Sequence, residues 1–262
     1  MSPVAGETWV GRLGADVHVW TVVLDESPAL SSRCEAMLSE DEREHAAAFR
    51  FEPSRRTFVV ARGCLRALLG RYLGVERSAI RFTYGLEGKP SIAFPATTLA
   101  FNQSHSGKRA VFALVCGSEI GIDIEEITQL ADIESIAERF FSPEEVADLR
   151  GISAAARERA FFATWTRKEA FIKATAQGLS FPLDRFRVTV DPREEARLLH
   201  LGGDASAARP WQMHGLGAGP SYAGALVYQG ERRALREFPI VGASELLQLV
   251  ETGDVPVDPQ GR

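Results

Sequence analysis

Three carboxylates and one lysine have spacings that would let them act together on one cation or one phosphate. Asp123 and Glu125 alternate with isoleucines in residues 120–125, which is typical of a strand with one buried face. Alternate side chains of a strand share a face, so both carboxylates point the same way, about 6–7 Å apart. Gly121 lies on that face too, and we expect it to leave room for a ligand. A solvated edge strand with exposed acids is the alternative interpretation.

The other two charged groups lie on a predicted helix over residues 157–176. Trp165, Glu169 and Lys173 are spaced four residues apart and therefore share one helix face. Glu four residues before Lys is also the favourable order for an ordinary surface ion pair. However, this helix is apolar around most of its circumference, and a charged pair on a mostly buried helix needs partners. A metal ion and a phosphate group would supply them.

Taken together, Asp123, Glu125, Glu169 and Lys173 indicate phosphoryl chemistry. Three hard oxygen donors suit Mg²⁺, which keeps some of its waters and shares phosphate oxygens with its substrate. In such reactions, positioning and charge neutralisation account for most of the catalysis.

A polar stretch at residues 101–108 follows a predicted strand at 99–102. We interpret residues 104–108 as a loop in which small hydroxyls, an imidazole and a glycine form a phosphate cradle. A capped turn with an exposed histidine is the alternative. A serine nucleophile is disfavoured, because no GxSxG elbow is present and adjacent Ser and His side chains seldom point at each other correctly.

A basic set lies earlier in the chain, on a predicted helix over residues 55–73 and in the turn after it. Helix-borne arginines and a lysine held between Gly88 and Pro90 could bind phosphates, and ordinary surface charge is the alternative. The set consists of Arg55, Arg56, Thr57, Arg62, Arg66 and Lys89.

Hydrophobic periodicity and turn signals predict a mixture of helices and strands, which is the α/β (α+β) class. Ser39 and Ser142 each precede a Glu by three residues, as in a helix-starting capping box. A further helix is predicted over 243–250, and residues 191–220 are Gly/Ala-rich and turn-prone. The predicted strands cover 17–23, 80–84, 99–102, 110–116, 120–125, 185–190 and 222–228.

A weak internal echo indicates two related halves. A helix, a Gly-containing loop and a strand occur at residues 62–83 and again at residues 167–189, and coincidence is the alternative. The corresponding division is an N-terminal lobe over 1–117, a C-terminal lobe over 118–253 and a flexible tail over 254–262. Ligands often bind at such an interface, so we expect the site between the lobes.

Composition excludes several classes of protein. The 262 residues are 45% hydrophobic and 25% charged, with a net charge of −5, which disfavours disorder, coiled coils and a whole-protein field for nucleic acid. The longest apolar run, residues 110–116, is too short to span a membrane, and no secretory signal is evident at the N-terminus. The three widely spaced cysteines favour neither a zinc site nor disulfides, so we expect a cytoplasmic protein.

In their order along the chain, these motifs resemble the 4′-phosphopantetheinyl transferases of the surfactin-synthetase-activating (Sfp-type) group. The resemblance runs from about residue 55 to about residue 190, and the ordered combination is more specific than any single piece. The pieces are Arg56-Thr57 with Arg62, Gly88-Lys89-Pro90, Phe101-Asn102-Gln103-Ser104-His105-Ser106, Gly121-Ile122-Asp123-Ile124-Glu125, Phe140-Phe141-Ser142 and Trp165-Thr166-Arg167-Lys168-Glu169-Ala170-Phe171-Ile172-Lys173.

The resemblance implies two pseudo-twofold-related lobes with coenzyme A between them. It also implies Mg²⁺-dependent transfer of phosphopantetheine to a carrier-protein serine, with release of 3′,5′-ADP. On this basis Asp123, Glu125 and Glu169 would hold Mg²⁺, Glu169 would be the catalytic base, and Lys173 would assist proton movement and the leaving pyrophosphate oxygen. The residues expected to grip coenzyme A are Arg56, Thr57, Arg62, Lys89, Ser104, His105 and Lys173.

One departure from the family pattern concerns the basic pair that meets the 3′-phosphate near the first helix. Here Glu40-Asp41-Glu42 and Glu44 occupy that region. Two other functions stay open: a coenzyme A-binding scaffold without catalysis, and another Mg²⁺-dependent phosphotransferase or hydrolase. The second would call for a phosphate loop such as GxxxxGK[ST], which is absent.

The expected partners are coenzyme A and acidic carrier proteins, with neither nucleic acid nor a membrane. Residues 139–159 carry several arginines around Phe140 and Phe141, and we interpret them as part of a docking surface, with a solvated helix pair as the alternative. Because the two lobes already supply both sides of the cleft, we expect a monomer.

Overall fold

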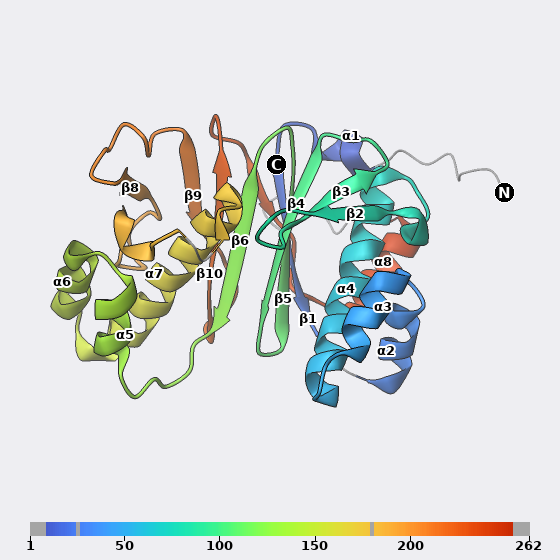
Figure 1. Cartoon of the computed structure of the whole chain (residues 1–262), viewed down its shortest axis with the longest axis horizontal. Helices are drawn as coiled ribbons and strands as arrows, with labels where there is room; N and C mark the ends of the chain where they lie inside the picture. Colours follow the sequence, from blue (N-terminus) through green and yellow to red (C-terminus); the bar gives the residue numbers. More distant parts are fainter. Residues whose placement is uncertain (1–8, 25–26, 179–180, 254–262) are drawn as a thin grey trace.

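The computed structural model describes residues 9–24, 27–178 and 181–253, so the expected tail over 254–262 lies outside the described residues. Two lobes lie side by side, each with a long helix packed along a small sheet (Figure 1). The α+β class and the two-lobed architecture predicted from the sequence are therefore confirmed.

The first lobe contains the described elements before residue 117, and the second lobe those from residue 120 to residue 229. The first comprises α1 (Trp9–Leu13), β1 (Val17–Val23), α2 (Pro28–Glu35), α3 (Glu40–Ala47), α4 (Glu52–Leu73), η1 (Arg77–Ala79), β2 (Arg81–Tyr84), β3 (Pro90–Phe94), β4 (Leu99–Ser106) and β5 (Arg109–Cys116). The second comprises β6 (Ile120–Glu126), α5 (Ile133–Phe140), α6 (Pro143–Gly151), α7 (Ala154–Thr175), η3 (Leu183–Arg185), β7 (Phe186–Val188), β8 (Leu198–Leu201), β9 (Trp211–Gly215) and β10 (Tyr222–Gln229).

The two lobes repeat one order of elements. A strand leads into three helices, a 3₁₀ turn, a two-stranded ribbon and a hairpin that pairs with the first strand. The sheets accordingly run β1-β5-β4 and β6-β10-β9, and the ribbons are β2-β3 and β7-β8. The internal echo in the sequence therefore corresponds to a repeat of the topology.

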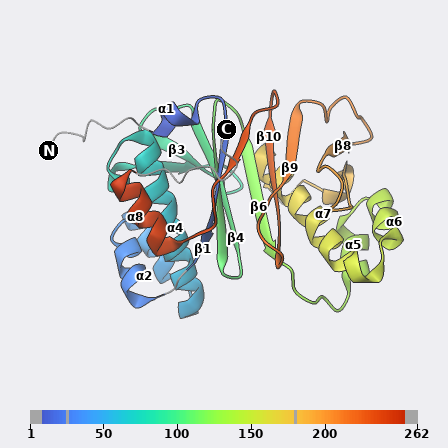
Figure 2. The same ribbon diagram turned by 180° about the vertical axis from the view of Figure 1, so that it is seen from behind.

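The C-terminal segment departs from the expected division at residue 117. After β10 the chain returns to the first lobe, where β11 (Leu235–Glu237) and β12 (Val241–Gly242) pair in parallel with β1. Helix α8 (Ala243–Thr252) then packs against α4, as Figure 2 shows from behind. Residues 235–252, expected in the C-terminal lobe, thus complete the first lobe, because α8 buries its apolar side in that core.

A shared apolar layer joins the lobes. Ile120, Ile122 and Ile124 of β6 are fully buried against valines of β1 and β5. This arrangement confirms the predicted alternation, and it leaves Asp123 and Glu125 on the face that meets α7.

Each lobe also has a buried ion pair that links its capping box to its long helix. Glu42 of the Ser39 box pairs with Arg66 of α4 at 2.5 Å, and Glu145 of the Ser142 box pairs with Lys168 of α7 at 2.7 Å. Both cations also donate to two backbone carbonyls just beyond their helix, which satisfies the remaining protons of Lys168, and Arg66 donates in addition to the Ser39 hydroxyl.

Two stretches that the sequence assigned to loops form strands. β4 continues to Ser106 in register with β5, so residues 104–106 are extended. Strands β8 and β9 lie within the turn-prone region 191–220. In the described part of the chain, no helix combines the length and the apolar character that crossing a membrane requires.

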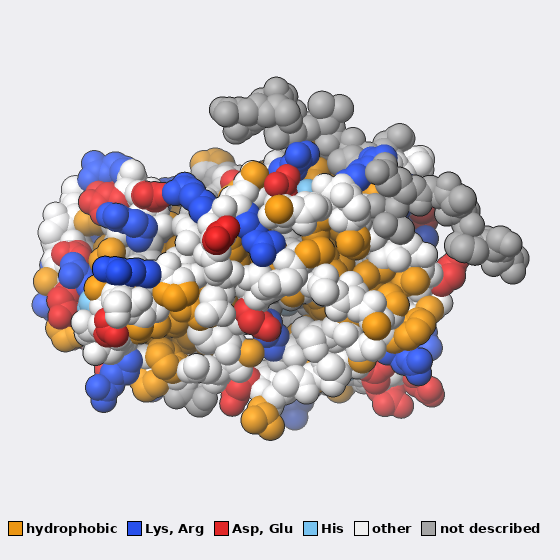
Figure 3. All heavy atoms as spheres, turned by 90° about the horizontal axis from the view of Figure 1, so that it is seen from above, with side chains coloured by type: hydrophobic (Ala, Val, Ile, Leu, Met, Phe, Trp, Pro, Cys, Tyr) orange, Lys and Arg blue, Asp and Glu red, His pale blue; other side chains and the backbone are white. Residues whose placement is uncertain are grey.

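On the face seen from above, basic and acidic side chains are interleaved over the second lobe (Figure 3). Hydrophobic side chains are more frequent over the first lobe in the same view. Over the described residues of the second lobe, charges of both signs therefore alternate on this face.

Candidate active site

Polar side chains along β4 bridge to β6 across the seam between the lobes. Both strands are edges of their sheets, and Asn102 Oδ1 accepts the N–H of Ile122 at 2.9 Å while Ser106 Oγ accepts that of Glu126 at 3.0 Å. Side chains therefore satisfy the edge groups of β6 that a neighbouring strand would otherwise pair. The alternating polar side chains of β4 therefore link the two lobes through hydrogen bonds to β6.

The hydroxyl groups of β4 also bind the carboxylates of β6. Ser104 Oγ donates to Asp123 Oδ1 at 2.8 Å, and Ser106 Oγ donates to Glu125 Oε2 at 2.7 Å. The interpretation of residues 104–108 as a phosphate-cradling loop was wrong in its geometry, because residues 104–106 belong to a strand that holds carboxylates. His105 lies between these two serines on β4, and desolvation and then the charge of Lys173 lower the pKa of its imidazole.

The helix face predicted for Glu169 and Lys173 is confirmed. Between residues 160 and 174 of α7, only Trp165, Glu169 and Lys173 are not buried. Lys173 Nζ lies 2.7 Å from Asp123 Oδ1 and 3.1 Å from Ser104 Oγ. Residues about 50 positions apart in the chain therefore meet here. We call Asp123, Glu125 and Glu169, beside Lys173, the carboxylate cluster, because their charges act on one another.

Gly121 has a different role from the one expected. A Cβ atom at this position would lie 2.1 Å from the carbonyl oxygen of Ala170 and 2.3 Å from the amide nitrogen of Ala174. The absent side chain thus makes room for the backbone of α7 rather than for a ligand. Because α7 and β6 lie so close together, the Lys173 side chain of α7 can contact Asp123.

Electrostatics couple the three carboxylates. Burial, followed by the negative charge of Asp123, raises the pKa of the Glu169 carboxyl, with Lys173 opposing and Glu125 adding to the shift. Burial also raises the pKa of Glu125, against the hydrogen bond from Ser106 and with the charge of Asp123. Asp123 itself is 3% exposed, and its Oδ2 atom is buried without a hydrogen-bond partner. The site therefore carries negative charge that Lys173 offsets.

A divalent ion suits this donor set in chemical type. Mg²⁺ prefers carboxylate oxygens as ligands. The Oδ2 atom of Asp123 is such an oxygen, and it is buried without a hydrogen-bond partner. Within the described ranges, no three Asp, Glu, His or Cys side chains are arranged as a ready metal site. Lys173 instead holds one Asp123 oxygen by an ion pair.

The α4 side chains that were expected to contact coenzyme A interact with protein groups in this structure. Arg56 pairs with Glu52 at 2.9 Å, and the Thr57 hydroxyl donates to the Pro53 carbonyl at 3.0 Å. Arg62 is buried 3.7 Å from Glu42, and its Nε and Nη1 atoms lack hydrogen-bond partners. The structure thus places these side chains in the first lobe, away from the carboxylate cluster.

Lys89 joins the two lobes. Its Nζ atom donates to the carbonyl of Ile120 at 3.0 Å and lies 3.5 Å from the carbonyl of Ala174, with Glu119 at 3.1 Å. These contacts tie the β2–β3 ribbon to the start of β6 and the end of α7. Lys89 also lines a cavity of about 760 Å³ to which both lobes contribute.

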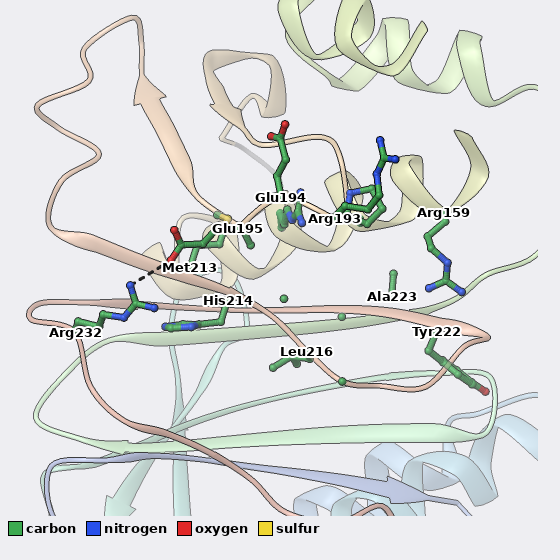
Figure 4. A pocket seen from close by; sticks show the side chains of 17 residues that line it. Arg159, Arg193, Glu194, Glu195, Met213, His214, Leu216, Tyr222, Ala223 and Arg232 are labelled. Atoms are coloured by element: carbon green, nitrogen blue, oxygen red, sulfur yellow. Dashed lines mark hydrogen bonds and ion pairs between the residues drawn. The ribbon is translucent and has the colours of Figure 1, made fainter. Parts of the chain in front are cut away.

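A separate pocket of about 520 Å³ lies in the second lobe between α7, residues 192–196 and strands β9–β10. Figure 4 shows Arg159 and Tyr222 at one end and Arg232 and His214 at the other. None of the predicted site residues lines it. The pocket therefore does not belong to the carboxylate cluster.

Two arginines of the expected docking segment, Arg150 and Arg157, are already paired with carboxylates. Arg150 binds Glu138, and Arg157 lies 3.1 Å from Glu134. Their charge is thus largely offset within the α5–α6 region, which weakens the interpretation of Arg150 and Arg157 as a basic docking patch.

Asn102 and Ser106, which lie within the motif at residues 101–108, were not assigned a role of their own from the sequence. The available signal was the alternation of Asn102, Ser104 and Ser106, which is the strand period of two. The buried Glu145–Lys168 pair was also missed, because a capping box does not reveal that its Glu turns inward.

Comparisons with known proteins cover segments of both lobes. Residues 119–227 match the 4′-phosphopantetheinyl transferase superfamily, and residues 27–116 match the 4′-phosphopantetheinyl transferase N-terminal family. The chain is 39% identical to 4′-phosphopantetheinyl transferase HetI of Nostoc sp., over 73% of this chain and 84% of that protein. It is 33% identical to 4′-phosphopantetheinyl transferase Sfp of Bacillus subtilis, over 69% of this chain and 75% of that protein.

Among solved structures, the Chronobacterium ammoniagenes ACPS–CoA complex matches 44% of this chain and 98% of that chain, at 23% identity and a TM-score of 0.33. The two family matches cover both lobes, and the relatives align over most of their own length. The chain therefore belongs to the 4′-phosphopantetheinyl transferase superfamily and is an enzyme of the Sfp type.

Proposed function

We propose that this enzyme transfers the 4′-phosphopantetheine group of coenzyme A to a serine of an apo acyl or peptidyl carrier protein, with Mg²⁺ as cofactor and 3′,5′-ADP as the second product. The observation that carries the proposal is the meeting of α7 and β6, where Lys173 Nζ lies 2.7 Å from Asp123 Oδ1 beside Glu125 and Glu169. The names of the relatives support the reaction class.

Glu169 is the proposed general base. A serine hydroxyl is a poor nucleophile at neutral pH and needs a group that takes its proton. Burial and the charge of Asp123 raise the pKa of Glu169, which makes its ionised form a stronger base than an ordinary carboxylate. Glu169 would accept the proton of the carrier serine directly or through one water.

Asp123, Glu125 and Glu169 are the residues that would hold Mg²⁺. When bound, the ion supplies positive charge against the charge that develops on the pyrophosphate. The hydrogen bonds from Ser104 and Ser106 keep two of these carboxylates oriented before any ligand arrives.

Lys173 is proposed to stabilise and protonate the leaving pyrophosphate oxygen. Its side chain is 30% exposed, so its ammonium group can reach a substrate while it remains near Asp123. Ser104, His105 and Lys89 at the seam, with Arg56, Thr57 and Arg62 on α4, remain the proposed contacts of coenzyme A.

The test is to incubate the protein with coenzyme A, Mg²⁺ and an apo carrier protein and to weigh the carrier by mass spectrometry. We expect the phosphopantetheine mass increment with the wild-type chain, and its loss when Mg²⁺ is chelated. Glu169→Gln is the matched control for the protein preparation. Coenzyme A binding without an increment on several carriers would favour the non-catalytic scaffold, and turnover without a protein acceptor would favour another phosphotransferase or hydrolase.

A cytoplasmic monomer remains part of the proposal. The three cysteines of the described chain are free thiols, which supports a reducing compartment. Gel filtration with light scattering tests the monomer, and a dimer mass would contradict it.

A further inference from the structure

Ser106 makes two hydrogen bonds whose directions are determined by chemistry. Its Oγ atom lies 2.7 Å from Glu125 Oε2 and 3.0 Å from the amide nitrogen of Glu126. The amide can only donate, so the hydroxyl oxygen accepts from it. The single hydroxyl proton is then directed at the Glu125 carboxylate, which can only accept.

The same serine secures the strand that carries the carboxylates. The N–H groups of Ile122 and Glu126 lie on the edge of β6 that faces β4, and Asn102 and Ser106 accept one each. Asn102 thus holds β6 on one side of Asp123, and Ser106 holds it on the other. Glu125 lies between the two anchored amides, next to the Ser106 anchor.

The backbone fold holds Ser106 in place for its contact with Glu125. Ser106 is the last residue of β4 and pairs with Arg109 of β5, so its backbone is held by the hairpin. Serine has one side-chain torsion before its oxygen, and little entropy is lost in keeping that oxygen in place. Glu125 has three such torsions and is only partly buried, so it depends on a partner to stay oriented.

We propose that Ser106 is a positioning residue that orients the Glu125 carboxylate toward Asp123 and Glu169, so that these groups can hold one divalent ion. This inference rests on the proposed function. Ser106 acts through Glu125 and through the β6 backbone, without contact to the reacting atoms. Loss of a group that orients a metal ligand typically weakens metal binding by about 10- to 100-fold.

The test compares Ser106→Ala with Ser106→Thr, which keeps the hydroxyl, and with Ser206→Ala. Ser206 is the matched control because its hydroxyl donates to Asp204 Oδ1 at 2.7 Å, in an exposed loop of the second lobe. Mn²⁺ binding to each full-length chain is measured by the electron paramagnetic resonance of free Mn²⁺, with and without coenzyme A.

We expect Ser106→Ala to bind Mn²⁺ about tenfold more weakly, Ser106→Thr to recover to within about twofold, and Ser206→Ala to match the wild type. In the transfer assay, the Mg²⁺ concentration for half-maximal rate should rise by a similar factor for Ser106→Ala, while the KM for the carrier stays within about twofold. Ser106→Cys, a weaker donor of similar size, provides an intermediate variant if the alanine variant does not fold.

Unchanged Mn²⁺ affinity in Ser106→Ala, or an equal loss in Ser106→Thr, would overturn the inference. Failure of the wild-type chain to bind Mn²⁺ under both conditions would also overturn it. A wild-type chain that binds Mn²⁺ but modifies no carrier contradicts the proposed function alone, because the affinity comparison between variants still stands.

Discussion

The two lobes share a scaffold but differ in what lies between the first strand and the long helix. In the first lobe β1 presents His18, Trp20 and Val22 to the core around α4, all of them buried. In the second lobe β6 presents Gly121, Asp123 and Glu125 to α7. The face of the first strand that meets the long helix is therefore packed into the core in one lobe and carries a charged site in the other.

Aromatic packing accounts for the closed interior of the first lobe. Trp20 stacks on Phe238 with ring centroids 4.0 Å apart and donates from Nε1 to the Tyr72 hydroxyl at 3.0 Å. Phe238 belongs to the C-terminal segment that returns from the second lobe. The returning chain thus helps to fill the core of the first lobe. In the second lobe, the corresponding face of β6 borders the seam between the lobes.

What the lobes keep in common is the buried ion pair. Glu42–Arg66 and Glu145–Lys168 join equivalent helices, and each cation also lies over an aromatic ring of the strand that follows, Phe82 or Phe186. The comparison teaches that the scaffold is held by groups remote from the site. The residues facing the first strand could then change without loss of the fold.

The largest expected effect concerns these paired anchors. Glu42→Gln and Glu145→Gln each leave a buried cation without its carboxylate, which should lower the free energy of unfolding by about 3–5 kcal/mol. Denaturant titration measures this, with the exposed Glu40→Gln as the control, expected to change by less than about 0.5 kcal/mol. If one lobe tolerated the change as well as Glu40→Gln does, the two pairs would not be equivalent.

The second prediction concerns the charged face of the second lobe. Asp123→Asn and Glu169→Gln should each reduce carrier modification by at least about a hundredfold, because a metal ligand or the base is lost. Glu169→Gln should not lower the melting temperature, since it removes like-charge repulsion, whereas Asp123→Asn also removes the ion pair with Lys173. A rate close to that of the wild type in either variant would refute the assigned role.

The third prediction concerns the close approach of α7 to β6. Gly121→Ala should cost about 1–3 kcal/mol of stability and reduce activity, since α7 must move away from Asp123. Gly215→Ala in β9 is the control, because a Cβ there meets nothing within 4 Å. Equal stability of the two variants, measured by thermal unfolding, would show that α7 can yield without strain.

The smallest expected effect lies in the aromatic interior of the first lobe. Desolvation, with the charge of Arg236, lowers the pKa of His18 to about 4, while Asp16 opposes the shift. The unfolded state then binds more protons between about pH 6.5 and 4, so stability falls as the pH falls through that window. From pH 7 to 5.5 the loss from this group should be about 1 kcal/mol.

The measurement for His18 is the free energy of unfolding against pH, for the wild type and for His18→Gln. The variant should lack this part of the slope, because it has no imidazole to titrate. Identical slopes for the two chains between pH 7 and 5.5 would mean that the pKa of His18 is the same in the folded and unfolded states, which contradicts the prediction.

Much of the site was predictable from periodicity. The strand alternation put Asp123 and Glu125 on one face, and the spacing of four put Glu169 and Lys173 on one helix face. Capping boxes at Ser39 and Ser142 predicted two helix starts. Each of these signals is local, and local backbone geometry determines which side chains share a face.

The remaining features depend on what packs against each face. Gly121 was expected to leave space for a ligand, yet α7 fills that space. Lys89 was singled out by its flanking Gly88 and Pro90, and only the structure shows that its ammonium group also binds carbonyls at the seam. Residues 235–252 follow the second lobe in sequence but complete the first. None of these outcomes has a local signal, because each depends on contacts between distant segments.

The sequence alone determined which residue types are available for the chemistry, their order along the chain and the face of the helix or strand that each occupies. These features follow from covalent spacing and the backbone period. Only the tertiary structure decided that Lys173 neutralises Asp123, that Ser104 and Ser106 hold the carboxylates and that one lobe is filled while the other is charged. The physical reason is that these contacts join two edge strands and a helix whose approach is governed by packing across the seam, which no single segment encodes.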